Sequence, residues 1–539
     1  MSINLRQVVF QLFFCYIFIS VTGQNLDTSL TEKKNTSVYD KKQDSVPSIK
    51  SSIFYNVRQF GAKGDSAAFD TDAINRAIDA AASAGGGTIY FPAGKYLSFS
   101  IRLKNNITLF LDNGAVLIAA DPNQGKGGYD APEPNAWDKY QDFGHSHWHN
   151  SLIWGENLQN ISITGPGVIN GKGLTRSGNT KEGVANKAIA LKLCRNVVLK
   201  DISVLTGGHF CLLATGVDNM TIDNLKLDTN RDGFDIDCCR HIHMSNCSVN
   251  SPFDDAIVLK SSFALGFAQF TEDVTITNCS VSGFDIGTFL NGTYKRENAA
   301  KVPDRGVVTG RIKFGTESNG GFRNITISNC TFEFCRGLAL ETVDGGILED
   351  ISISNITMRD VQGALFFLRL GARMRGPDET PIGKLRRINI SNVVAYGANP
   401  DYASLLAGIP GYAIEDVKLD NITILVKGGA SAEQSANIVP EKEKAYPDPQ
   451  EFGKMPAYGF FIRHVKNITV TNVELKLENE DFRPPFILED VSGAVFINVR
   501  APHAANTPSF ILKNVTDFST VNCGTMPDKK IEKTAEDKF

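Results

Sequence analysis

The sequence predicts an all-β chain, a right-handed parallel β-helix with a short capping helix near its amino end. The first observation is a short strand pattern that recurs along the chain, with 22 or 23 residues between its closest copies. The second is an asparagine that returns at one fixed register of this pattern. The third is a helical spacing of apolar residues ahead of the repeats.

Each repeat alternates apolar and polar residues, which is the period of a half-buried strand. The longer intervals are a bare coil with loop insertions or an extra turn. Because each coil buries its side chains only against neighbouring coils, 539 residues can form one solenoid instead of several domains. The repeats begin at Asn160, Asn196, Asn219, His241, Asp273, Asn324, Asp350, Arg387, Asp416 and Asn467.

Most repeats end on an asparagine, a residue that tolerates the left-handed backbone of a tight turn. Stacked asparagines can also hydrogen-bond to one another along the axis. Cys247, Cys279 and Cys330 each follow such an asparagine and are therefore expected to stack as a ladder. The asparagines of this register are Asn224, Asn246, Asn278, Asn329, Asn355, Asn392, Asn421 and Asn472.

The predicted capping helix covers Thr71 to Ala84, between the cap Asp70-Thr71-Asp72 and the glycines 85–87. It would cover the open end of the solenoid, which otherwise presents unpaired strand edges. Its apolar positions are Ala73, Ile74, Ala77, Ile78 and Ala81.

Four segments are expected: a signal peptide over 1–23, a flexible linker over 24–50, the β-helix catalytic domain over 51–525, and a polar tail over 526–539. The signal has Arg6 before a mostly apolar stretch, Val8 to Val21, and small residues at its end. An uncleaved membrane anchor is the alternative, although the stretch is short for a span. The sequence therefore predicts a secreted or periplasmic protein with no stable membrane insertion after cleavage.

Removing the signal leaves nine cysteines, an odd number for an oxidising compartment. Several occupy repeat positions and can pack as small apolar groups, so a disulfide framework is not expected. A bridge from Cys238 or Cys239 to a neighbour stays open. The many Asn-X-Ser/Thr triplets, Asn160 and Asn219 among them, are explained by the strand pattern in preference to glycosylation. A net charge of −4 without a long basic run argues against nucleic acid as a partner. The protein is expected to be a monomer.

Two adjacent coils hold a dense group of carboxylates, in segments 230–237 and 251–257. Asp232 and Asp254 are 22 residues apart, one bare coil, so they are expected side by side. Close like charges raise at least one pKa, which provides a protonated acid beside ionised carboxylates. Glycoside hydrolysis needs this division of labour. Solvated turn aspartates and calcium ligands are the alternatives.

At this point the sequence resembles glycoside hydrolase family 28, the polygalacturonases and their relatives, from about Phe54 to at least Asn355. The resemblance rests on the segment Gln59 to Asp65, on Asn-X-Asp-Gly-X-Asp from Asn230, and on the adjacent pair Asp254-Asp255. It implies a right-handed parallel β-helix and hydrolysis with inversion of the anomeric centre.

Residue by residue, the resemblance implies that Asp254 is the general acid. Asp232 and Asp255 would hold and deprotonate the attacking water, and Asp235 would give structural support. No metal and no cofactor are expected.

Two motifs of the family are not matched. A Gly-His-Gly segment is replaced by Thr309-Gly310-Arg311, and the Arg-Ile-Lys segment that grips the substrate carboxylate is replaced by Ala339-Leu340-Glu341. Arg311 and Lys313 share one face of a strand, where they either place positive charge in the cleft or face solvent. Glu341 would hydrogen-bond a sugar hydroxyl or neutralise Arg311.

Three further residues are predicted to contact substrate. Trp148 lies in an insertion over 121–151, and Tyr294 lies in another over 284–308. His209 precedes Asp232 by 23 residues, which places it one coil below. The alternating histidines 145, 147 and 149 could bind a metal, but a sugar-stacking wall is the preferred interpretation.

The sequence therefore predicts an inverting hydrolase that acts on galacturonate-containing or other acidic, pectin-like oligosaccharides and polysaccharides. Long insertions on both sides of the carboxylates favour a closed pocket and attack at a chain end. A β-helix polysaccharide lyase, with Arg311 or Lys313 as base, and a non-catalytic polysaccharide-binding β-helix are the rival predictions.

Overall fold

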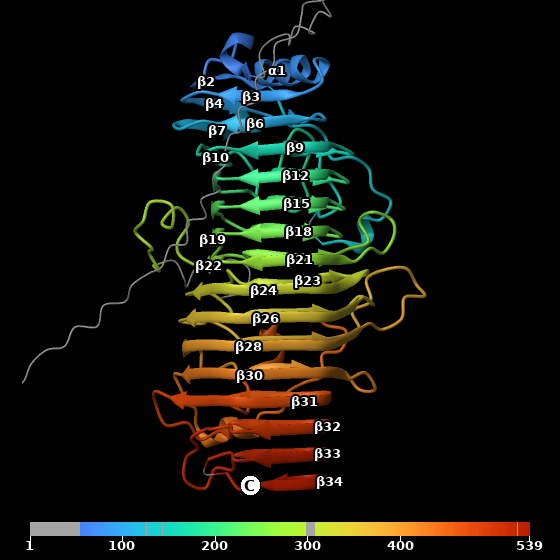
Figure 1. Ribbon diagram of the computed structural model, residues 1–539, viewed down its shortest axis with the longest axis vertical. Coiled ribbons are helices and arrows are strands. Elements are labelled where there is room, and N and C mark those ends of the chain that lie inside the picture. The colour runs from blue at the N-terminus through green and yellow to red at the C-terminus, as the bar shows by residue number, and fades with distance from the viewer. Residues whose placement is uncertain (1–53, 125–126, 143, 298–307, 525) are drawn as a thin grey trace, which may run out of the picture. The chain divides into compact units, whose positions relative to one another are not determined.

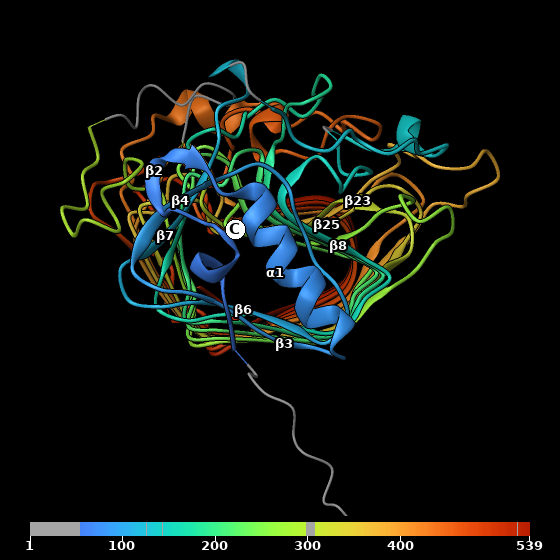
Figure 2. The same ribbon diagram turned by 90° about the horizontal axis from the view of Figure 1, so that it is seen from above.

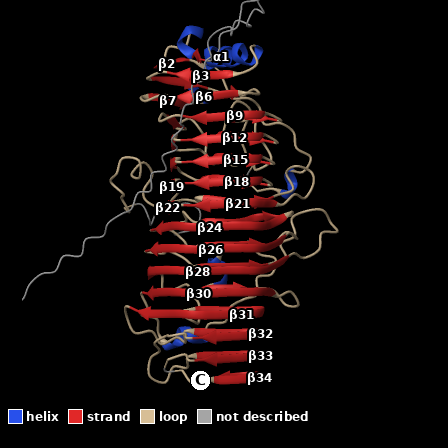
Figure 3. Cartoon of the chain, in the orientation of Figure 1, coloured by secondary structure: helices blue, strands red, loops and turns tan. Residues whose placement is uncertain are grey.

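The computed structural model describes residues 54–124, 127–142, 144–297, 308–524 and 526–539. The segments predicted as signal peptide and linker, 1–23 and 24–50, lie outside the described residues. Within residues 54–539 the chain forms the predicted right-handed parallel β-helix, with strands stacked coil on coil (Figure 1; Figure 3). None of the described helices combines the length and apolar character needed to cross a membrane.

The strands pair in three rows, one for each face of the coil. The first row contains the recurrent strand pattern and runs through β1 (Phe54–Asn56), β3 (Gly87–Phe91), β6 (Ile107–Leu111), β9 (Gln159–Thr164), β12 (Arg195–Lys200), β15 (Asp218–Asp223), β18 (Arg240–Ser245), β21 (Thr271–Thr277), β24 (Gly321–Glu333), β26 (Ile347–Arg359), β28 (Lys384–Ala398), β30 (Ile414–Val426), β31 (Phe460–Leu477), β32 (Phe486–Ile497), β33 (Phe510–Val521) and β34 (Lys529–Lys538).

The second row continues from the turn that follows each asparagine, and later merges with the long strand β24. It contains β2 (Asp65–Phe69), β4 (Gly94–Ser98), β7 (Ala115–Ala119), β10 (Val168–Asn170), β13 (Ser203–Leu205), β16 (Lys226–Asp228), β19 (Ser248–Asn250) and β22 (Ser280–Ser282).

The third row carries the predicted catalytic residues at the amino ends of its strands, and ends on β31. It contains β5 (Ile101–Arg102), β8 (Ser151–Glu156), β11 (Lys187–Lys192), β14 (Phe210–Thr215), β17 (Asp232–Asp237), β20 (Ile257–Ser261), β23 (Ile312–Ser318), β25 (Leu338–Thr342), β27 (Phe366–Leu370) and β29 (Ser404–Ala407).

The predicted asparagine ladder is present in part: four of the asparagines bond to one another in succession, whereas Asn224, Asn246 and Asn472 donate to aspartates of the preceding coil. Asn355 donates to Asn329 over 3.0 Å, Asn392 to Asn355 over 3.1 Å, and Asn421 to Asn392 over 2.7 Å. All four have positive φ, between 52° and 57°, the left-handed conformation that asparagine tolerates. The ladder therefore turns the chain at the same point in each of these coils.

The cysteines are buried and free, including Cys238 and Cys239, so the bridge left open at these positions is not formed. Cys247, Cys279 and Cys330 stack as predicted, because Ser248, Ser280 and Thr331, the next residues along, are register partners. Apolar stacks fill the interior in the same way. One such stack contains Ile161, Val197, Met220, Ile242 and Val274.

The capping helix α1 (Thr71–Ser83) lies across the amino end of the coil (Figure 2) and buries the five predicted apolar positions. Asp70 occupies the N-cap position, but its carboxylate accepts from the backbone amides of Lys63 (2.6 Å) and Gly64 (3.0 Å) instead of the helix's own amides. The remaining helices are single 3₁₀ turns: η1 (Val57–Phe60), η2 (Pro122–Gln124), η3 (Asp138–Tyr140), η5 (Ala432–Ala436) and η6 (Pro449–Phe452).

The carboxy end differs from the prediction of a polar tail over 526–539. Residues 529–538 form β34, which pairs antiparallel with β33 as the last strand of the first row. Its alternating charged residues cover an edge that would otherwise present unpaired backbone groups. The polar composition of residues 526–539 predicted a tail, but most of these residues form a polar strand at the edge of the sheet.

Candidate active site

The three predicted catalytic aspartates lie where the second row of strands turns into the third. Asp232 begins β17, and Asp254 and Asp255 lie in the corresponding turn of the next coil, before β20. Phe234 pairs with Ile257, an offset of 23, so the register partner of Asp232 is Asp255 and not Asp254 as the 22-residue spacing predicts. The turn nevertheless gathers all three carboxylates, with one oxygen of each within 4.8 Å of the others.

All three carboxylates are buried, and two of them receive strong charged partners. Asp254 accepts from Arg231 Nε at 3.0 Å. Asp255 accepts from Arg311 Nε at 2.6 Å, and Lys313 Nζ lies 3.3 Å from its other oxygen. The protein thus supplies the positive charge that a bound cation would otherwise provide to this cluster.

Asp232 has a different environment. Burial, followed by the charges of Asp254 and Asp235, raises the pKa of Asp232 well above its usual value. Asp254 accepts hydrogen bonds on both oxygens, from Arg231 and from the Asp255 amide at 3.0 Å. Because these carboxyl groups lie so close together, their protons belong to the group as a whole.

A small pocket opens over these aspartates. It is lined by Asp142, His145, Arg231, Asp232, Asp254, Asp255, Lys260, Lys313, Thr316, Glu317 and Tyr446.

A second charged network lies under the pocket. Lys260 Nζ is 3.0 Å from Glu317 Oε2 and 3.9 Å from Asp235 Oδ2, and His145 Nε2 is 3.0 Å from the same Asp235 oxygen. Burial opposes the ionised form of Glu317, but Lys260 and His145 hold the pKa of this carboxyl well below its usual range. The network supports Asp235, which the resemblance assigns a structural role.

The pair Arg311 and Lys313 is buried, so the solvent-facing alternative is wrong. Glu341 is fully buried behind them, with its oxygens 3.7 Å from Arg311 Nη2 and 3.5 Å from Lys313 Nζ. Neither Arg311 nor Glu341 lines the pocket. Glu341 therefore neutralises Arg311, the second of its two predicted roles.

Two predicted substrate contacts are wrong because the side chains are buried. Trp148 has no exposed surface, and its Nε1 donates to Thr215 Oγ1 at 3.0 Å, so it cannot stack on a sugar. His209 is also buried, 2.6 Å from Arg231 Nη1, and it positions Arg231 instead of lining the pocket. Burial and then the charge of Arg231 lower the pKa of His209 well below its usual value.

Tyr294 is half exposed but lines a different hollow, with Phe284, Phe289 and Arg296. The described part of the 284–308 insertion therefore does not reach the acid pocket. The second side of that pocket comes instead from Tyr446, in the connection between β30 and β31. Sequence reasoning missed Tyr446 and Asp142, because no spacing relates these loops to the aspartates.

The histidines of the run 145–149 do not converge. His145 contacts Asp235, His147 lies 3.2 Å from Asp138, and His149 lies 2.9 Å from Glu156. Asp235 and Glu156 thus hold the insertion to the coil, Asp138 pairs within the insertion, and His145 alone of the three histidines lines the pocket. A metal site shared by the three histidines is not formed.

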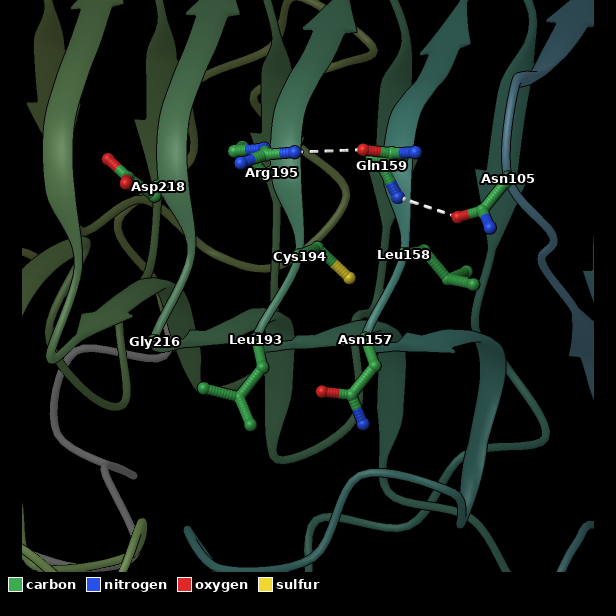
Figure 4. A pocket seen from close by; sticks show the side chains of 9 residues that line it. All are labelled: Asn105, Asn157, Leu158, Gln159, Leu193, Cys194, Arg195, Gly216 and Asp218. Carbon is green, nitrogen blue, oxygen red and sulfur yellow. Dashed lines mark hydrogen bonds between the residues drawn. The ribbon is translucent and has the colours of Figure 1, made fainter.

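Another hollow of the described chain lies over the turns of the first row (Figure 4). There the Gln159 amide donates to Asn105 at 2.8 Å, and Arg195 donates to Gln159 at 2.9 Å. Asp218 is the one carboxylate among its lining residues, so this hollow offers no acid paired with a base.

Comparison with known proteins agrees with this site. Residues 139–443 match the model of glycosyl hydrolases family 28, and residues 54–203 match that of rhamnogalacturonase A/epimerase, pectate lyase-like proteins. A probable polygalacturonase of Vitis vinifera is 24% identical over 68% of this chain and 73% of its own. An exo-poly-alpha-D-galacturonosidase of Dickeya chrysanthemi is 32% identical over 31% of this chain and 27% of its own.

Among solved structures, the family 28 exopolygalacturonase of Yersinia enterocolitica is similar with a TM-score of 0.60 and 18% identity, over 82% of this chain and 78% of that one. An exopolygalacturonase from Thermotoga maritima gives 0.53 and 16%, over 90% and 95%. These two likenesses show the fold. The family model spans more than half of the chain and includes all three aspartates, and the chain therefore belongs to family 28 of the glycosyl hydrolases.

Proposed function

We propose that this O-glycosyl hydrolase is an exo-acting, inverting enzyme for galacturonate-containing or other acidic, pectin-like oligosaccharides and polysaccharides. The observation that carries the proposal is the pocket over the three carboxylates, which a bridge between two loops borders on one side. Asp142 and Arg375 form a bidentate ion pair that joins the 121–151 insertion to the loop after β27. This bridge walls one side of the pocket, and a chain that continued in both directions would need that side open. The name of the Dickeya chrysanthemi relative supports the exo assignment.

In the proposed reaction, Asp254 gives a proton to the glycosidic oxygen as the bond from that oxygen to the anomeric carbon breaks. Water attacks the anomeric carbon, and its proton goes to Asp232 or Asp255, so one carboxyl loses the proton that another gains. Burial and the neighbouring carboxylates raise the pKa of Asp232. The proposal therefore requires that, with the sugar bound, Asp254 carries the proton and the carboxylate that accepts the proton of water is ionised.

The lyase alternative is not favoured, because neither Lys313 nor Arg311 is available to accept a proton. A lyase needs a group that can remove a proton from carbon. Burial alone would lower the pKa of Lys313, but Asp255 and then Glu341 raise it above the ordinary value, so Lys313 stays protonated. Arg311 is bonded to Asp255 and is not among the residues lining the pocket.

A time course on polygalacturonate and on rhamnogalacturonan fragments tests the exo-acting proposal. We expect one small sugar to accumulate from the start, with slow loss of viscosity and no ultraviolet-absorbing unsaturated product. Proton NMR of the first product is expected to show the anomer opposite to the bond cleaved. An early ladder of oligosaccharides would sink the exo proposal, and the retained anomer would overturn inversion.

We also propose export from the cell, on the strength of Arg6 and the apolar stretch Val8 to Val21. Mass spectrometry of the protein recovered outside the cytoplasm of its host is expected to find a mature chain that begins near Gln24. A chain that retains residues 1–23 would contradict this.

A further inference from the structure

The charges around the acid pocket indicate which kind of sugar it accepts, an inference that rests on the proposed exo-hydrolase function. Carboxylates outnumber cations among the residues that line the pocket. The five carboxylates are Asp142, Asp232, Asp254, Asp255 and Glu317, and the three cations are Arg231, Lys260 and Lys313.

Each of these three cations is already engaged by a carboxylate of the protein. Arg231 bonds Asp254 at 3.0 Å. Lys260 bonds Glu317 at 3.0 Å. Lys313 lies 3.3 Å from Asp255.

The positive groups just outside the pocket are committed in the same way. Arg375 pairs with Asp142, and Arg373 Nε donates to Asp344 Oδ1 at 3.0 Å. Behind Lys313, Glu341 is fully buried, and neither of its oxygens accepts a hydrogen bond within the described structure. Each of these positive groups, and Arg311 with Asp255 at 2.6 Å, therefore already pairs with a carboxylate of the protein before a ligand enters.

A sugar carboxylate would bring one more negative charge into this buried site. Removing such a charge from water is costly unless a cation pairs with it, and here every such cation would have to be shared with a carboxylate of the protein. A hydroxymethyl or methyl group at the same position adds no charge. The charges of the pocket therefore disfavour a uronate there and do not disfavour a neutral sugar.

We propose that the pocket takes a neutral terminal sugar, and that uronates of the substrate lie on the leaving-group side of the bond. The sugar released is then an uncharged hexose or deoxyhexose, cut from the end of an acidic chain. The carboxylates that line the pocket determine this specificity. Asp142 is one of them and is not one of the three catalytic aspartates.

Matched aryl glycosides test this proposal. para-Nitrophenyl hexosides, the corresponding uronides and the methyl esters of those uronides are compared in the galacto, gluco and manno series with the full chain. Because the uronide brings an additional negative charge close to the lining carboxylates, we expect kcat/KM for the neutral hexoside to exceed that for the uronide at least about tenfold. The methyl ester, which keeps the uronide's skeleton without its charge, should recover most of this difference.

The variant Asp142→Asn removes one lining charge and releases Arg375. We expect the preference for the neutral glycoside over the uronide to fall at least about threefold, a change of about 0.6 kcal/mol. Asp130→Asn is the matched control. Asp130 lies in the same insertion as Asp142 and forms a similar ion pair, with Arg102 of β5 at 2.6 Å, but it does not line the pocket. An unchanged preference in Asp142→Asn would overturn the charge argument.

Calorimetric binding of free hexoses and hexuronates to the unchanged protein separates this inference from the proposed function. Tighter binding of a hexose supports the inference without requiring turnover. Tighter binding or faster cleavage of the uronide, or no binding of any sugar, overturns it. Preferential uronide cleavage would leave the exo-hydrolase proposal standing, whereas hexose binding without hydrolysis of any glycan would remove the proposed function and keep the binding preference.

Discussion

Asp254→Asn is expected to lower kcat by about 10²–10⁴ while the fold stays intact, because the amide cannot give a proton to the glycosidic oxygen. Asp232→Asn and Asp255→Asn should be nearly as damaging, since they remove the groups that hold and deprotonate water. Turnover is measured as released reducing ends, with circular dichroism and the thermal midpoint as checks on folding.

Asp218→Asn is the matched control for these variants. Asp218 is an aspartate of the first row, where it pairs with Arg240 at 3.2 Å, and it does not line the acid pocket. This variant is expected to keep ordinary turnover. If Asp254→Asn retained most of its activity on natural substrate, the three-aspartate account would be wrong.

Arg311→Met is expected to destabilise the fold strongly, by about 3–5 kcal/mol in the free energy of unfolding. The substitution leaves Asp255 and Glu341 buried with Lys313 as their nearest cation, and burial already raises the pKa of Glu341. The measurement is the denaturant midpoint and slope, compared with those of the unchanged protein.

Arg387→Met is the control for this change. Arg387 pairs with Asp350 at 2.7 Å on the exposed side of the coil, where solvent screens the interaction, so the midpoint should not move. The double variant Arg311→Met with Glu341→Leu should recover part of the lost stability, because it removes a buried charge together with its partner. Equal midpoints for Arg311→Met and the unchanged protein would contradict the buried-network account.

The repetitive part of the structure could be predicted from the sequence because its rules are local. A strand period of two, an asparagine that accepts positive φ and a one-coil spacing together place Asn355 on Asn329 and bring Asp232 to the pair Asp254-Asp255. Every coil repeats the same geometry, so a residue's register in one coil gives its neighbours in the next. This reasoning also reached the buried cysteine ladder.

The rest of the site depends on loops that have no repeat. Asp142 meets Arg375 across 233 positions of sequence, and Tyr446 approaches Lys313 across 133. Trp148 was expected on a sugar-binding wall, but its insertion folds back and buries the indole against Thr215. Composition gives a loop its polarity, whereas the direction in which it folds is decided by contacts such as His149 with Glu156.

The assignment of Asp254 as the acid is tested most directly by the dependence of rate on the leaving group. The unchanged protein, Asp254→Asn and Asp232→Asn are compared on glycosides of a poor leaving group, such as a sugar hydroxyl, and of dinitrophenolate, which departs without a proton. The account predicts that dinitrophenolate restores most of the lost rate in Asp254→Asn and little of it in Asp232→Asn, because only the first variant lacks the proton donor. Recovery in Asp232→Asn instead would show that Asp232 is the proton donor, and would contradict the account.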